Sequence, residues 1–114
     1  MSSTMIKKGN VTIVRFYGEI NYESVQPVLD EAQKLAKEKK GNKILFNFHD
    51  ARFVGSSNLT KLLQTMRSFR KTKSIQTSFC CMNNEFMRML KAYQGKDPVE
   101  VFESEQEAVG KIDN

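Results

Sequence analysis

The fold of this chain is decided by residues 48–59, FHDARFVGSSNL, where an apolar strand is followed by a turn and then by a helix. Upstream, residues 44–48 are a short run of branched and aromatic side chains, which is typical of a strand. Downstream, apolar residues recur at helical spacing at Leu59, Leu62, Leu63, Met66 and Phe69. The pattern therefore predicts a strand-to-helix junction with two serines at the start of the helix.

Ser56 and Ser57 have two interpretations at this position. A serine at a helix N-terminus accepts hydrogen bonds from backbone N–H groups that have no partner within the helix. The same N–H groups, together with the positive end of the helix dipole, also favour a phosphate. The junction is therefore either a structural cap or a position suited to phosphate, and the local sequence leaves both open.

Length and composition indicate one domain. The chain has 114 residues, 39% of them hydrophobic, and eight Phe can furnish a modest core. Residues 1–10 are polar and basic, unlike a signal peptide, and no later apolar run is long enough to cross a bilayer. We expect a single cytoplasmic domain over residues 1–114.

The two cysteines, Cys80 and Cys81, are adjacent in an apolar segment. Successive side chains of a strand point to opposite faces, so we expect these thiols not to pair with each other. No nearby basic cluster or helix start is present to activate a thiol. The prediction is two free cysteines that fill the core in a reducing compartment.

The net charge is +5, and basic residues gather around two predicted turns. These residues are Lys37, Lys39, Lys40, Lys43, Arg67, Arg70, Lys71 and Lys73. Such a balance suits an acidic partner, a nucleic acid or a membrane surface. Basic residues at helix C-termini also offset the helix dipole, and we favour that interpretation because no basic cluster is interleaved with aromatics as in a single-strand binder.

Strand and helix signals alternate along the chain. Strands are expected over residues 1–6 as an edge segment, 11–17 after a Gly9-Asn10 hairpin turn, 44–48, 74–82 and 99–102. Helices are expected from residues 21–24 to about 40, over 59–69, from a cap at Asn83 or Asn84 to Gly95, and from a capping box at 104–107 to 112. This order predicts an α/β fold with a mixed, largely parallel sheet and an antiparallel pair at its start.

Polar residues alternate with apolar ones in two of the central strands. Asn47, His49, Gln76 and Ser78 fall on one side of the sheet. Parallel strands covered by helices on both faces are apolar throughout, so this alternation favours helices mainly on one face. We expect the four polar side chains to share the less covered face, with His49 at a strand end.

The span from about Val11 to Ile112 resembles the STAS domain, the anti-sigma factor antagonist family. Three segments carry the resemblance: residues 18–21 (GEIN) before the first helix, 43–48 (KILFNF) in the central strand, and 53–59 (FVGSSNL) at the turn. The resemblance implies a STAS-like β-α superhelix. It also implies that Ser56 falls where the family carries its phosphorylated Ser or Thr, with Ser57 on the next hydroxyl position.

The chain departs from the family pattern at the turn itself. Gly55 stands where the family has an acidic residue, Asn58 where it has a glycine, and Asn21 where an Asp is frequent. Losing the carboxylate before Ser56 removes a negative charge and a capping group, and glycine adds backbone freedom. Two versions of the function therefore stay open, a phosphoswitch and a constitutive module.

The resemblance implies a non-enzymatic module in signalling and transcription regulation. Its partner would be an anti-sigma factor or a histidine-kinase-like regulator, which docks on the helix start near Ser56. The partner-binding candidates are Gly55, Ser56, Ser57, Asn58 and Lys61. The alternative is a constitutive STAS scaffold without a phosphoswitch, and self-association is a further option.

Other classes fit the residues poorly. A serine hydrolase would need a G-x-S-x-G elbow, whereas residues 55–58 read GSSN, and His49 is the only histidine. With one histidine and no ligand cluster at metal spacing, we expect no metal ion, no cofactor and no catalytic residue. A nucleic-acid binder rests on charge alone, and we expect neither a nucleic-acid nor a membrane partner.

Overall fold

A computed structural model describes residues 3–20, 22–38, 42–53, 60–61, 64–65, 75–94 and 100–112. The strands are β1 (Ser3–Lys8), β2 (Val11–Ile20), β3 (Asn42–Phe53), β4 (Ile75–Cys80) and β5 (Val101–Phe102). The helices are α1 (Tyr22–Glu38), α3 (Asn84–Gln94) and α4 (Glu105–Ile112). Thr60, Lys61, Gln64 and Thr65 are also helical. The predicted order of elements is confirmed wherever these residues allow it to be followed.

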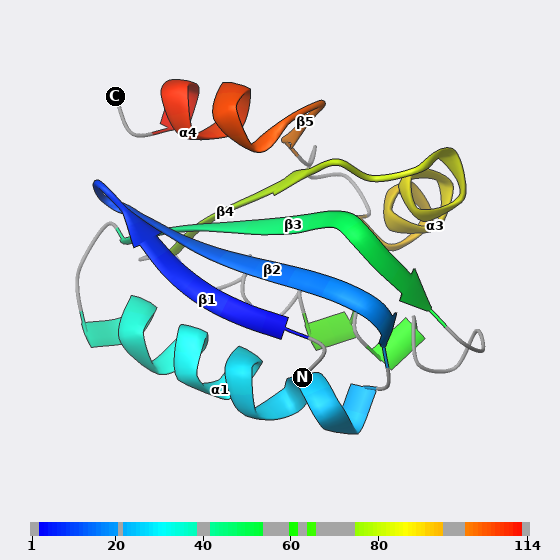
Figure 1. Ribbon diagram of the computed structural model, residues 1–114, viewed down its shortest axis with the longest axis horizontal. Coiled ribbons are helices and arrows are strands. Elements are labelled where there is room, and N and C mark those ends of the chain that lie inside the picture. Colours follow the sequence, from blue (N-terminus) through cyan, green and yellow to red (C-terminus); the bar gives the residue numbers. More distant parts are fainter. Residues whose placement is uncertain are drawn as a thin grey trace.

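The strands form one five-stranded sheet in the order β1-β2-β3-β4-β5 (Figure 1). β1 pairs antiparallel with β2 through a hairpin in which Gly9 has a φ of 58°, a left-handed value that glycine adopts readily. The other neighbours are parallel. The mixed, largely parallel sheet with an antiparallel start is therefore confirmed.

β2 and β3 both run further than the sequence predicted. We expected them to end near Tyr17 and Phe48, but they stay paired until Ile20 meets Phe53. The register changes on the way, because Arg15 pairs with Asn47 whereas Tyr17 pairs with Asp50, which places one extra residue in β3. This bulge shifts the two-residue alternation of β3, so the alternation pattern does not show where β3 ends.

Aromatic side chains form the core on one face of the sheet. The ring of Phe16 stacks on Phe48 with centroids 5.1 Å apart, and Phe46 stacks on Phe79 at 5.7 Å. Phe86 of α3 meets Phe48 edge-on at 6.0 Å. Leu29 and Ala32 of α1 and Leu90 of α3 are buried in the same cluster. α1 and α3 therefore cover this face.

Among the described helices, only α4 packs on the opposite face (Figure 1). Ala108 and Ile112 of this helix are buried against residues Val11, Ile13, Leu45 and Cys80. The prediction of helices mainly on one face is confirmed. The expected openness of the other face is wrong for Asn47 and Ser78, which are 8% and 1% exposed, while His49 and Gln76 are exposed.

Two predicted helix caps are present. Asn83 accepts a hydrogen bond at Oδ1 from the backbone N–H of Phe86, with the two atoms 2.8 Å apart. Ser104 accepts one at Oγ from the N–H of Glu107 at 3.1 Å. These bonds satisfy N–H groups that lack intrahelical partners, so α3 and α4 begin where the sequence places their caps. None of the described helices combines the length and apolarity needed to cross a lipid bilayer.

The aromatic core yields a stability prediction. Phe46 is fully buried and stacks with Phe16 and Phe79, so Phe46→Ala leaves a large cavity. We expect the free energy of unfolding to fall by about 3–5 kcal/mol in a denaturant titration. Gln26→Ala on the exposed side of α1 is the control and should change it by less than about 0.5 kcal/mol. Equal midpoints for the two variants would contradict the assigned core.

Candidate functional site

The residues that the sequence singled out lie mostly beyond the described chain. Gly55, Ser56, Ser57 and Asn58 are outside the described residues, so their roles stay predictions. Lys61 is described, helical and exposed, and its carbonyl oxygen accepts a hydrogen bond from Thr65 Oγ1 at 3.0 Å. The strand before the junction and helical residues after it are confirmed.

The ends of β2 and β3 show at which edge of the sheet the chain continues into the segment with the two serines. Ile20 pairs with Phe53, so the two parallel strands end side by side. α1 begins at Tyr22, directly beyond this edge. Carboxyl ends of parallel strands are a common place for binding sites in α/β folds. The segment from 54 to 59 follows a strand that ends at such an edge.

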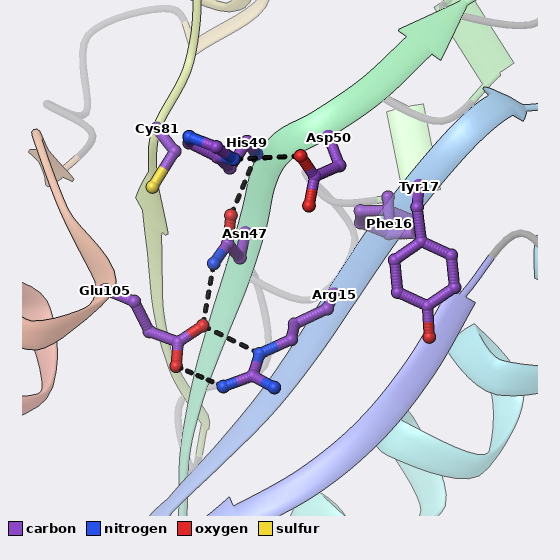
Figure 2. Close-up of a pocket in the computed structure, with 8 residues that line it drawn as sticks. All are labelled: Arg15, Phe16, Tyr17, Asn47, His49, Asp50, Cys81 and Glu105. Carbon is purple, nitrogen blue, oxygen red and sulfur yellow. Dashed lines mark hydrogen bonds and ion pairs between the residues drawn. The ribbon is translucent and has the colours of Figure 1, made fainter.

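A second feature is a polar cavity on the α4 face of the sheet (Figure 2). Its volume is about 440 Å³. The lining comes from β2, β3, the end of β4 and the start of α4, and consists of Arg15, Phe16, Tyr17, Asn47, His49, Asp50, Cys81 and Glu105. Local sequence patterns predict no cavity here and single out only some of these residues.

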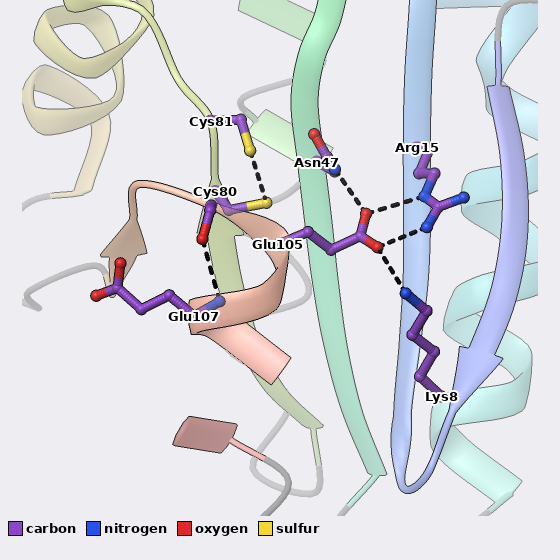
Figure 3. A network of polar contacts seen from close by, with 8 residues as sticks. Lys8, Arg15, Asn47, Cys80, Cys81, Glu105 and Glu107 are labelled. Atoms are coloured by element: carbon purple, nitrogen blue, oxygen red, sulfur yellow. Dashed lines mark hydrogen bonds and ion pairs between the residues drawn. The ribbon is translucent and has the colours of Figure 1, made fainter. Parts of the chain in front are cut away.

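Glu105 is the centre of the polar contacts at this cavity (Figure 3). Its Oε2 accepts hydrogen bonds from Arg15 Nε at 2.9 Å and from Asn47 Nδ2 at 2.7 Å. Its Oε1 accepts from Arg15 Nη2 at 2.5 Å and from Lys8 Nζ at 3.2 Å. The guanidinium binds the carboxylate through two parallel bonds, the strongest geometry for such a pair. We call Lys8, Arg15, Asn47 and Glu105 the Glu105 network.

The network sets the charge state of the cavity. Hydrogen bonding to Arg15 lowers the pKa of Glu105 to about 2, outweighing desolvation, and the bonds to Asn47 and Lys8 act in the same direction. The same contact with Glu105 raises the pKa of Arg15. Both groups are therefore charged at neutral pH and neutralise each other. Arg15 is engaged within the chain, so the cavity is not built around an uncompensated guanidinium.

Asn47 joins this network to the bulge in β3. Its Oδ1 accepts a hydrogen bond from the backbone N–H of His49 at 2.8 Å, while its Nδ2 donates to Glu105. A bulge disrupts the ladder locally and leaves backbone groups to be satisfied by other partners. The amide therefore supports the bulge and binds α4 at once, which explains a nearly buried Asn in a central strand.

His49 lies within β3 at the bulge, so its predicted place at a strand end is wrong. Its Nδ1 is 2.9 Å from Asp50 Oδ1, with the side chains 73% and 68% exposed. Among the described residues no group of three or more His, Cys, Asp or Glu side chains is arranged to hold a metal ion. The exposed pair is a polar rim of the cavity.

Cys80 and Cys81 correct another prediction. Their sulfurs do not point to opposite faces, because Cys81 has a φ of 65° that turns its side chain back, and the Cys81 thiol donates to Cys80 Sγ at 3.3 Å. Both are free thiols, as expected. Burial, followed by the contact with Cys81, raises the pKa of the Cys80 thiol above its usual range.

Local patterns along the chain indicate this cavity only in part. Alternation placed Asn47 on a face with few helices. Glu105 was visible only as part of a capping box. Its contacts with Arg15 and Asn47 join residues far apart in the chain, and no local pattern specifies such partners.

The Glu105 network predicts a specific loss of stability. Glu105→Gln removes the negative charge and leaves Arg15 partly buried without its partner. We expect the free energy of unfolding at neutral pH to fall by about 2–3 kcal/mol. Glu107→Gln is the matched control, because the Glu107 contact with Lys111 spans 3.8 Å between exposed side chains, and its loss should cost under about 0.5 kcal/mol. Similar losses in both variants would contradict the assignment.

The same group predicts a pH dependence. The folded-state pKa of Glu105 is lowered from 4.5 to about 2, so its stabilisation is complete above pH 4.5 and is lost as the pH falls towards 2. The stability difference between wild type and Glu105→Gln should therefore shrink over this interval and disappear below pH 2. Denaturant titrations at several pH values measure it. A difference that stays constant throughout would rule out ionised Glu105 as the cause.

Comparisons with known proteins extend these observations. The phosphorylated form of the Bacillus cell fate determinant SpoIIAA is similar in fold, with a TM-score of 0.70 and 19% identity over 96% of this chain and 98% of that chain. An anti-sigma-factor antagonist (STAS) domain protein from Planctomyces limnophilus has a TM-score of 0.72 and 14% identity, over 98% of both chains. An anti-sigma factor antagonist from Mycobacterium paratuberculosis has a TM-score of 0.68 and 16% identity, over 98% and 93%.

At these identities the solved structures establish the fold alone. No curated protein sequence matches the chain at a significant level. The STAS domain family, however, matches residues 2–108, which is nearly the whole chain. The sheet order, the helices on its two faces and this match agree with one another. The chain belongs to the STAS domain family.

Proposed function

We propose that this STAS domain is a non-enzymatic, cytoplasmic regulatory module that acts as an anti-sigma factor antagonist. Its docking surface is the helix start formed by Gly55, Ser56, Ser57 and Asn58, with Lys61 on the following helix. The observation that carries the proposal is the family match over residues 2–108, which includes the serine pair between β3 and helical residues. The partner is an anti-sigma factor or a histidine-kinase-like regulator.

Electrostatics support control at Ser56. Phosphorylation adds about −1.5 to −2 charges, and placing that charge in a docked surface costs desolvation and repulsion. Shifting a partner from almost fully bound to almost fully free takes about 5.5 kcal/mol, which is within reach of one buried phosphate. SpoIIAA, which shares the fold, has been solved in phosphorylated and unphosphorylated forms. The same chemistry at Ser56 is part of the proposal.

Lys61 has a separate role in the proposal. Its side chain is exposed, and the helical residues Thr60 and Lys61 follow Ser56 by a few positions in the sequence. An exposed lysine at this place favours a partner with a complementary acidic surface and accelerates association more than it adds affinity. Lys61→Gln should therefore lower the association rate and weaken its salt dependence.

A second candidate is a constitutive scaffold module. The observation that favours it is Gly55, which replaces the acidic residue expected before the phosphoacceptor. In that case the helix start still binds a partner, but no kinase acts on Ser56. The two candidates differ in whether the bound state responds to a charge at this residue.

The described chain offers little for catalysis. His49 contacts Asp50 on an exposed rim, and the nearby Arg15 and Glu105 are engaged with each other. A nucleophile oriented by a general base would be needed for hydrolysis. The binding role is therefore favoured over a hydrolase. In this proposal residues 1–114 form one domain.

The test compares charge at neighbouring positions. Immobilised wild-type protein is used to recover partners from native lysate, which are identified by mass spectrometry together with any phosphosite on this chain. Binding of the recovered partner is then measured for Ser56→Asp, Ser56→Ala and Ser57→Asp. We expect Ser56→Asp to weaken binding at least tenfold, about 1.4 kcal/mol, and Ser56→Ala to bind like wild type.

Ser57→Asp is the matched control because it places the same charge one residue away. Circular dichroism and unfolding midpoints must show that all variants are equally folded. Equal binding by wild type, Ser56→Asp and Ser56→Ala would overturn the phosphoswitch and favour the scaffold. Equal weakening by both Asp variants would show that Ser56 is not a specific control point.

A further inference from the structure

The paired thiols at the end of β4 form a site that the binding function does not use. Cys81 Sγ lies 3.3 Å from Cys80 Sγ, and Cys81 is the only non-glycine residue with a positive φ among the residues that the structure describes. A residue other than glycine in this region is uncommon and is often found where function requires it. We propose that Cys80 and Cys81 form a reversible two-electron redox site that a hydroperoxide oxidises to a disulfide.

Access to the two sulfurs is unequal. Cys80 is fully buried against Ala108 and Ile112 of α4, whereas Cys81 is partly exposed and lines the 440 Å³ cavity (Figure 2). A small oxidant in that cavity can reach the thiol of Cys81 but not that of Cys80. Because burial also raises the pKa of Cys80, this thiol stays protonated and Cys81 reacts first.

The reaction has two balanced steps. Cys81 sulfur attacks one peroxide oxygen, the S–O bond forms, the O–O bond breaks, and the departing hydroxide takes the thiol proton as water. Cys80 sulfur then attacks Cys81 sulfur, the S–S bond forms, the S–O bond breaks, and the second hydroxide leaves as water with the Cys80 proton. Two thiols and one hydrogen peroxide give one disulfide and two waters.

The backbone favours the second step. The left-handed conformation of Cys81 has already turned its sulfur back to Cys80, and the Cys81 N–H is fixed to the carbonyl of Phe102 at 3.0 Å. Neighbouring Cα atoms are only about 3.8 Å apart, closer than the roughly 4.4–6.8 Å usual for disulfides. The ring that a disulfide between these two adjacent residues would close is therefore strained, and the disulfide is easily reduced, as labile disulfides are.

The test exposes folded wild-type protein to a small excess of hydrogen peroxide. Trypsin releases both cysteines in the peptide covering residues 74–88. We expect this peptide to lose the mass of two hydrogen atoms, both titratable thiols to disappear, and dithiothreitol to restore them. Oxidation of Met82 or Met87 adds oxygen to the same peptide and is distinguished by mass.

Two variants separate the roles of the thiols. In Cys81→Ser, Cys80 should remain a free thiol while the protein is folded. In Cys80→Ser, dimedone should trap a sulfenic acid on Cys81. Sulfinic acid at Cys81 or a covalent dimer in the wild type, with Cys80 still free, would overturn the proposal. So would a disulfide that forms only in urea. These readouts are independent of partner binding at Ser56.

Discussion

The carboxylate of Glu105 is the constraint on which the α4 face of the sheet depends. α4 has eight residues, too few for a helix to be stable without tertiary contacts. At its start, Glu105 binds Arg15 and Asn47 of the two central strands (Figure 3). At its end, Lys43 Nζ donates to the carbonyl of Ile112. The short helix is thereby held to the sheet at both ends.

The fold could be predicted well from local patterns, apart from one place. Alternation in the strands and apolar stripes in the helices specify the order of elements, because both depend on neighbours in sequence. β3 was predicted too short because the bulge after Asn47 breaks its alternation. Phe48 and Ala51 consequently pack on the same core although they are an odd number of residues apart. A two-residue period cannot show this.

The candidate sites differ in what reveals them. The serine pair around Ser56 is identified by its resemblance to a family motif, a local signal. The Glu105 network depends on contacts between distant segments, and the thiol pair depends on a left-handed backbone at Cys81, which no propensity of cysteine predicts. Arg15, Asn47 and Glu105 on the α4 face are engaged with one another, whereas the serine pair follows the edge where β2 and β3 end.

A double-mutant cycle between Arg15 and Glu105 tests most directly whether one carboxylate holds α4 on the sheet. The free energy of unfolding is measured for wild type, Arg15→Gln, Glu105→Gln and the double variant. The two-bond geometry of this pair predicts a coupling energy above about 1 kcal/mol. A parallel cycle on the exposed Glu107 and Lys111 should give about 0.3–0.5 kcal/mol. Coupling between Arg15 and Glu105 no larger than in this exposed pair would contradict the account.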